Sequence, residues 1–505
     1  MAMVWFSLHI LQTREKTDVR VIMNEANSLH QNGKEPTILD RWDILAFGFG
    51  NIQNDMCGSM VLGYLLVYCT MVLELSNESA TIIVMACQIA DGLSTILVGY
   101  LVTQTKQCWF SKKYGNLKSW HLLGTFLVAS TFPLIFRKSV FQDHSTASET
   151  ELVIYYSITS TLYAFGWAVS QISHLSMITA KSSFKMDWYS LTSIRNMGTV
   201  HANLVVTALF AIFLSKEKKV LPVDDINFEV VGLSVLGIGV LASFTFQFYF
   251  KLEDRGYEII SDINYSCKSL PSNPDIKDHP EKKCEIKEKS QCSWLRQAKL
   301  VKIGRIATTF VISRLFYTTA QTFVPLYVEY TLNKSAVNIA IIQSLMYLGG
   351  ILTSCSSQGL INKFGIEKLL VCGSFLGIAM AAWIFVGVDQ TFRKYEAYVM
   401  VIILGVVQSL FQICCLAKIA EKAADSSNSS SFLYGFMSFS EKLLCGVSVY
   451  LFEKLAPNSH SPYEQDFYRI MIAVVFSVTS TLLGTISALE CIWTCLYSKR
   501  TNPEL

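Results

Sequence analysis

Long apolar segments separated by short charged stretches run through most of this 505-residue sequence. A segment of about 20 apolar residues crosses the ~30 Å hydrocarbon core of a bilayer as an α-helix. Helices are required there because lipid offers no partner to the backbone N–H and C=O groups. The composition agrees: 16% of the residues are charged, against roughly 25% in an average soluble protein. The sequence therefore predicts an all-α membrane protein.

Twelve transmembrane helices are predicted, over residues 44–73, 79–103, 119–136, 152–179, 195–214, 229–250, 300–330, 336–356, 369–388, 396–419, 430–453 and 467–492. The polar segment 251–299 divides them into two six-helix halves, 44–250 and 300–492. The tails are 1–43 and 493–505. Loops on the side of both tails carry the excess of Lys and Arg, which predicts that both termini and the linker are cytosolic.

The other composition features narrow the class of protein. A net charge of +3 gives no indication of nucleic-acid binding. Most of the fourteen cysteines fall in predicted spans, and those of the linker lack zinc-site spacing, so free thiols are expected. The sequons at Asn77 and Asn333 face the lumen or exterior in this topology, which predicts glycosylation there.

An internal repeat relates the two halves. The hexamer KYGNLK (113–118) lies between spans two and three, and KFGIEK (363–368) lies between spans eight and nine. Each reads Lys-aromatic-Gly-x-x-Lys and precedes an apolar span. Duplicated six-span bundles are typical of major facilitator transporters, which bind their substrate between the halves near the middle of the membrane.

Several polar side chains interrupt the apolar spans. Asp91 lies inside QIADGLSTILVGYL, with Gln88 and Thr95 about one turn away, so we expect a polar stripe directed into the bundle. A charge at this depth costs about 2.5–3.5 kcal/mol on insertion scales. Two explanations stay open: a permanent ion pair with Arg195 or Lys442, or binding of a substrate ammonium group or a proton.

The first and fourth spans carry further candidates. Asn54 and Asp55 either line a central cavity or mark the interfacial end of span one. In span four, Gln171 and His174 lie close together, and His174 serves either as a proton carrier or as a hydrogen bond between helices.

The remaining charged residues lie in spans five, seven and eleven. Arg195 and Arg314 either extend to the interface or face the interior. Glu441 and Lys442 are adjacent, so their side chains point about 100° apart and do not pair with each other. We expect Lys442 to reach a carboxylate such as Asp55 or Asp91.

These residues belong to segments that resemble one family along nearly the whole chain. The segments are FGNIQNDMCGSMVLGYLLVY, QIADGLSTILVGY, YGNLKSWHLLGTF, FGWAVSQISHLSMI, LTSIRNMGTVHANL, RLFYTTAQTFVPLYVEY and LYGFMSFSEK. They are similar to the major facilitator superfamily domain-containing protein 12 group, in the glycoside–pentoside–hexuronide:cation symporter branch. The resemblance implies a twelve-helix major facilitator fold and import of cysteine from the cytosol into lysosomes or related organelles such as melanosomes. The segment GYEII around Tyr257 is similar to a lysosomal sorting signal read by adaptor proteins.

Departures from the sodium-coupled sugar symporters of this branch bear on the substrate. Those proteins have a second acid where Thr95 stands and a sugar-binding aspartate where Gln171 stands. Their span-five arginine and span-eleven lysine correspond to Arg195 and Lys442. Sodium–sugar symport is therefore disfavoured.

The expected site joins carboxylates and cations of both halves, with protons as a possible coupling ion and no cofactor or metal. It comprises Asn54, Asp55, Gln88, Asp91, Thr95, Gln171, His174, Arg195, Arg314 and Lys442. The alternatives are a cation-coupled symporter of a sugar or another small solute, and a scaffold without transport. An enzyme is not expected, because no partnered nucleophile or acid stands near His174 or His201 at helical spacing.

Overall fold

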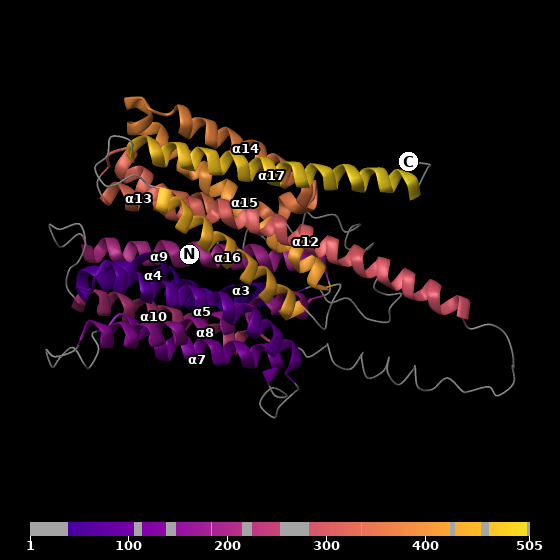
Figure 1. The fold of residues 1–505 in the computed structure, drawn as a ribbon, viewed down its shortest axis with the longest axis horizontal. Coiled ribbons are helices and arrows are strands. Elements are labelled where there is room, and N and C mark those ends of the chain that lie inside the picture. The colour runs from indigo at the N-terminus through magenta and orange to yellow at the C-terminus, as the bar shows by residue number, and fades with distance from the viewer. Residues whose placement is uncertain are drawn as a thin grey trace.

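The computed structural model describes residues 39–105, 114–137, 148–182, 184–214, 225–252, 282–334, 336–424, 430–455 and 464–501. Within these ranges the chain is helical, and the helices form two side-by-side bundles that run roughly parallel to one long direction (Figure 1). The indigo-to-magenta bundle is the N-terminal half, and the orange-to-yellow bundle is the C-terminal half.

The N-terminal half contains six spans, the first of which is broken. Its elements are α3 (Arg41–Phe49), α4 (Ile52–Val67) with the π-helix η1 (Tyr68–Val72), α5 (Asn77–Gln104), α7 (Asn116–Ile135), α8 (Glu149–Lys181), α9 (Lys185–Leu214) and α10 (Asp225–Tyr249). The fifth span begins ten residues before the predicted start at 195, because Asp187 is buried and accepts hydrogen bonds from Leu39 N and Ser182 Oγ.

The C-terminal half repeats this arrangement. Its elements are α12 (Lys282–Leu326) with η3 (Tyr327–Thr331), α13 (Ala336–Phe364), α14 (Ile366–Val386), η4 (Phe392–Glu396) with α15 (Ala397–Ala424), α16 (Ser430–Leu455) and α17 (Glu464–Thr501). The sequence predicted a polar linker over 251–299 and a helix start at 300, but α12 already begins at Lys282. Likewise α17 continues through most of the predicted tail. Both helices extend beyond the bundle at the same end (Figure 1), which we call the linker end.

Apolar side chains cover the outside of the bundle. Exposed large residues include Phe126, Leu241, Phe248, Phe375 and Leu489, and a helical membrane protein presents such residues to lipid. Among the described helices, six are long and apolar enough by themselves to cross a membrane, namely those within α5, α8, α10, α14, η4–α15 and α17.

Backbone geometry at equivalent positions confirms the repeat seen in the sequence. Gly115 and Gly365 have φ of 82° and 81°, and each precedes the third span of its half. Such a conformation is nearly restricted to glycine, which explains its place in both hexamers. The first span of each half also ends in a π-helix, followed by a residue with positive φ: Glu74 at 54° and Asn333 at 56°.

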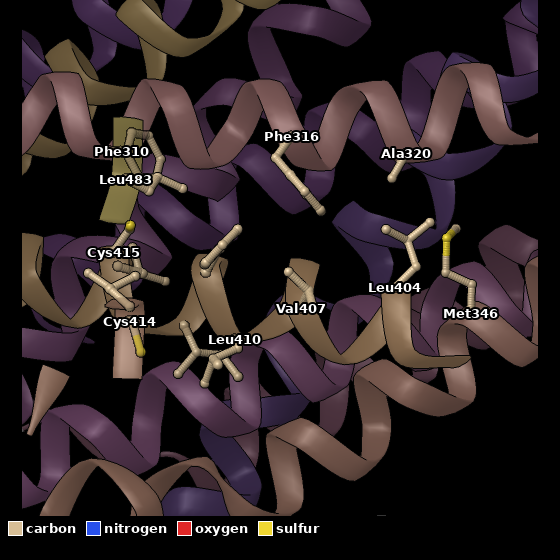
Figure 2. Packing of buried hydrophobic residues seen from close by; sticks show 14 of the residues in the cluster. Phe310, Phe316, Ala320, Met346, Leu404, Val407, Leu410, Cys414, Cys415 and Leu483 are labelled. Carbon is tan, nitrogen blue, oxygen red and sulfur yellow. The ribbon is translucent and has the colours of Figure 1, made fainter. Parts of the chain in front are cut away.

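The C-terminal half is built around an apolar core. Figure 2 shows Phe310, Phe316 and Ala320 of α12 facing a row of α15 side chains, with Met346 and Leu483 at the sides. The labelled side chains of that row are Leu404, Val407 and Cys415, whereas Leu410 and Cys414 lie on the side of α15 away from α12. Because lipid tails are as apolar as these side chains, close packing rather than removal from water holds such helices together.

The two halves meet along two helix pairs, α5 with α16 and α9 with α13. A Cβ at Gly435 would lie 2.5 Å from the Thr95 carbonyl oxygen, and one at Gly99 would lie 2.7 Å from that of Ser431. Small residues therefore let the α5 and α16 backbones touch. The halves are in direct contact between the centre of the bundle and the linker end.

Candidate functional site

Asp91 forms an ion pair with Lys442 across the boundary between the halves. Asp91 comes from the middle of α5 and Lys442 from the middle of α16, and the two side chains are only 7% and 12% exposed. The sequence left open whether Asp91 pairs with Arg195 or Lys442, or binds a substrate ammonium group or a proton. The contact that the structure describes is with Lys442. The adjacent Glu441 points elsewhere, as expected for neighbouring positions on a helix.

The Lys442 ammonium group has two further neighbours on α8. Its Nζ lies 4.4 Å from the centre of the Trp167 ring, a cation–π contact, and 3.4 Å from Gln171 Oε1. The Trp167 indole is fixed by its own N–H, which donates to the Asn54 carbonyl oxygen at 3.0 Å. A carboxylate, an aromatic face and an amide oxygen thus surround one cation.

A second ion pair lies within the C-terminal half. Arg314 of α12 contacts Glu441 Oε1 of α16 through Nη2 at 2.5 Å and Nε at 2.6 Å. The Arg314 guanidinium also lies 4.7 Å from the centre of the Tyr317 ring. Both charged side chains are largely buried, so Arg314 faces the interior and does not extend to the interface.

Asp55 and Arg195 take part in neither of the two ion pairs described above. Asp55 of α4 accepts a hydrogen bond from Thr199 Oγ1 at 2.6 Å, and Thr199 lies one turn beyond Arg195 on α9. The charges of Asp55 and Arg195 interact, but within the described part of the chain neither side chain has a salt bridge. Arg195 is 6% exposed, and its Nε has no hydrogen-bond partner there. Two opposite charges without a salt bridge to a described residue therefore lie on α4 and α9, within electrostatic reach of Arg314 in the C-terminal half.

Asn54 adds an unsatisfied amide next to this pair. The side chain is 1% exposed, and neither its oxygen nor its nitrogen has a hydrogen-bond partner among the described residues. A buried polar group of this kind costs free energy unless a water or a ligand binds it. This part of α4 and α9 thus offers a carboxylate, a guanidinium and an amide to a polar ligand.

The expected polar stripe around Asp91 is only partly formed. Gln88 is exposed, so it lies at the rim of the interior and not inside it. Thr95 is buried, but its hydroxyl donates to the Gly92 carbonyl oxygen of the same helix at 2.8 Å. The stripe fails because α5 packs closely on α16 near Thr95 but carries Gln88 past the end of that contact.

The sequence placed His174 among the charged residues of the expected site, but its hydrogen bond and its stacked ring contact are with Phe47 of the first span. Its ring stacks on Phe47 at 4.1 Å, and its Nε2 lies 3.0 Å from the Phe47 carbonyl oxygen. His121 Nε2 lies 2.8 Å from the Gly50 carbonyl oxygen, on the same broken stretch of the first span. Both rings therefore satisfy carbonyl groups at the break between α3 and α4. For His174 this is a hydrogen bond between helices, one of the two roles considered from the sequence, and only the helix break was not foreseen.

The remaining predictions concern residues at or beyond the edges of the described ranges. Asn333 is exposed, and Asn77 is the first residue of α5, so glycosylation at either remains a prediction. Tyr257 and its sorting motif, and most of the linker, lie outside the described residues. In the described part of the chain no group of three His, Cys, Asp or Glu side chains is placed to hold a metal ion.

The sequence matches one family of known proteins over most of its length. The family described as MFS/sugar transport protein matches residues 46–257 and 275–496. These two ranges cover nearly all of the two six-helix halves and contain all ten candidate site residues.

Three mammalian relatives share one name. The chain is 29% identical to the human "Major facilitator superfamily domain-containing protein 12" over 428 residues, 82% of this chain and 85% of the relative. It is 28% identical to the horse protein over 447 residues, 85% of this chain and 87% of that one. The mouse protein is also 28% identical, over 425 residues, 82% of this chain and 85% of that one.

Solved structures share the fold at low sequence identity. A bacterial homologue of the iron transporter ferroportin, in an outward-facing state with soaked iron, superposes with a TM-score of 0.58 at 10% identity, covering 88% of this chain and 98% of that one. The transporter FucP, in the outward conformation, has a TM-score of 0.56 at 11% identity, covering 88% and 99%. The twelve-helix prediction is confirmed, and the family is one of transporters and not of enzymes. The chain belongs to the MFS/sugar transport protein family of the major facilitator superfamily.

Proposed function

We propose that this secondary transporter carries a small zwitterionic solute, with cysteine as the first candidate, from the cytosol into lysosomes or related organelles. The observation that carries the proposal is the pair of unpaired opposite charges, Asp55 and Arg195, near the centre of the bundle. A zwitterion brings an ammonium group for the carboxylate and a carboxylate for the guanidinium. The mutual interaction of the two protein charges offsets part of the cost of burying them, and the bound substrate would offset more of it.

The choice of Arg195 for the substrate carboxylate rests on how the three central cations are occupied. Lys442 already pairs with Asp91, and Arg314 already pairs with Glu441. Arg195 has no such partner in the described part of the chain, and a guanidinium binds a carboxylate through two parallel hydrogen bonds. Asn54, one residue before Asp55, offers an amide to the same solute.

The Asp91–Lys442 pair has a different part in this proposal. It joins the two halves at mid-membrane, whereas alternating access rocks one half against the other around a fixed site. The pair therefore has to open or shift in each transport cycle, and a proton on Asp91 would weaken it. Proton coupling through Asp91 is accordingly part of the proposal.

Cysteine and the lysosome come from the resemblance to the protein 12 group, and Thr95 and Gln171 support them. Neither residue supplies the charge that sodium–sugar symporters of the branch place there. Uptake of labelled cysteine into intact lysosomes, from cells with and without this protein, tests the proposal directly. Uptake should depend on the protein and be lost in Arg195→Gln. Unchanged uptake without the protein, together with uptake of a sugar that requires it, would favour the sugar-symporter alternative.

A further inference from the structure

A small pocket lies between α4, α5 and α8, beside the Asp91–Lys442 pair. Its walls include Gly58, Cys87, Gln88, Asp91, Tyr163 and Ala164. The enclosed space has room for about one water-sized group. The pocket therefore accepts the end of a small side chain and has no space for a sugar ring.

Most residues that line the pocket are apolar or small, and one of them, Tyr163, carries an unsatisfied hydroxyl. Gly58 and Ala164 contribute little bulk, and Cys87 is 6% exposed. Tyr163 is 2% exposed, and its hydroxyl has no hydrogen-bond partner among the described residues. This hydroxyl lies close enough to Cys87 and Asp91 to interact electrostatically with both. A buried hydroxyl without a partner costs free energy unless a water or a ligand binds it.

Trp167 holds the pocket next to the charged site. Its ring borders the pocket, lies against the Lys442 ammonium and donates to the Asn54 carbonyl oxygen. A Cβ at Gly58 would lie 3.1 Å from Trp167 Nε1, so glycine at this position keeps the indole close to α4. Gly58 is also one turn from Asp55 along the same helix, which places the pocket within a few ångströms of the proposed ammonium site.

We propose that this pocket receives the end of the substrate side chain and selects a single small, uncharged, hydrogen-bonding group, a thiol or a hydroxyl. The inference rests on the proposed function, because the α-ammonium and α-carboxylate of the solute have to bind Asp55 and Arg195. Tyr163 then supplies the hydrogen bond that distinguishes a thiol or hydroxyl from a methyl group. The size of the pocket excludes longer side chains.

Selectivity between isosteric amino acids tests the Tyr163 contact. Cysteine and 2-aminobutyrate have side chains of the same length, but the second ends in a methyl group. In proteoliposomes containing the full-length protein, cysteine and serine should compete with labelled cysteine about five-fold better than 2-aminobutyrate. Tyr163→Phe should remove this difference and retain transport. Tyr68→Phe is the matched control, because Tyr68 is a buried tyrosine of the same half and the same aromatic cluster but does not line the pocket.

Glycine and Ala164→Val test the size of the pocket. Glycine has no side chain to place there, so Ala164→Val should weaken competition by cysteine about ten-fold and leave competition by glycine unchanged. Equal losses for glycine and cysteine, or a Tyr163→Phe variant that keeps the wild-type preference, would overturn the inference and leave the proposed function standing. Wild-type protein that transports no zwitterionic amino acid would overturn both, and this outcome is visible before any variant is made.

Discussion

The two halves share a repeat but place their buried charges differently. In the C-terminal half, Arg314 pairs with Glu441, and Lys418 lies between Glu367 and Glu490. In the N-terminal half, Asp55 and Arg195 stand close together without a salt bridge to any described residue. Paired charges fix the positions of helices, whereas unpaired charges need a ligand. The comparison indicates that the N-terminal half recognises the solute. The C-terminal half is the half whose helices are firmly connected to one another by ion pairs.

The largest effect is expected from removing an unpaired charge. Asp55→Asn or Arg195→Gln should lower cysteine uptake by at least about 30-fold, because each leaves one charge of the substrate buried without a partner. Initial uptake rates in proteoliposomes, normalised to folded protein, measure this loss. Arg305→Gln in the C-terminal half is the matched control, since Arg305 is half exposed and pairs with Glu490. Wild-type uptake by either N-terminal variant would remove the distinction between the halves.

Breaking the ion pair between the halves should lower the free energy of unfolding. Asp91→Asn leaves Lys442 buried without its carboxylate, which costs about 3–5 kcal/mol for a buried pair. The double variant Asp91→Asn/Lys442→Gln removes both charges and should recover most of that loss. Thermal unfolding of the purified protein in detergent measures the two steps. A double variant no more stable than the single one would show that the pair does not carry this energy.

A charge within the C-terminal half should affect stability and leave recognition unchanged. Glu490 of α17 contacts Lys418 of α15 and Arg305 of α12. Glu490→Gln should therefore lower the free energy of unfolding by about 1–3 kcal/mol. Uptake per folded molecule should stay at the wild-type level, because all three helices belong to one half. A changed affinity for cysteine would show that this network takes part in substrate binding.

The smallest effects are expected at the repeated turns. Gly115→Ala and Gly365→Ala each force a side chain into the glycine-only conformation, at a cost of about 1–3 kcal/mol. Because the two backbones are nearly the same, the two variants should lose equal stability in unfolding experiments. Gly63→Ala is the control: Gly63 lies within α4, and an added Cβ meets no atom within 4 Å. Unequal losses would show that the turns have diverged in their surroundings.

The sequence predicted the features that depend on local pattern. Hydropathy located the twelve spans, and the Gly115 and Gly365 hexamers identified the repeat, because both signals are written along single helices and turns. The direction of Lys442 toward a carboxylate also followed from helix geometry alone. Its partner was left open between Asp55 and Asp91, since the choice depends on where α16 crosses the N-terminal half.

Features that depend on packing between helices were not predicted. The hydrogen bonds at the break between α3 and α4 come from His121 of α7 and His174 of α8, so they require both of these helices in place. The Arg314–Glu441 pair joins residues 127 positions apart. The unsatisfied Tyr163 hydroxyl has no sequence signal at all, because an aromatic residue in an apolar span is typical of any membrane helix.

The most direct test of the central claim compares cysteine with two analogues that each lack one charge. Cysteamine has no carboxylate, and 3-mercaptopropionate has no ammonium group. Wild-type protein should bind cysteine more tightly than either analogue, as measured by titration calorimetry of the purified protein. Arg195→Gln should bind cysteine and cysteamine equally, and Asp55→Asn should bind cysteine and 3-mercaptopropionate equally. If Arg195→Gln still prefers cysteine by the wild-type factor, the account of a zwitterion held between Asp55 and Arg195 is wrong.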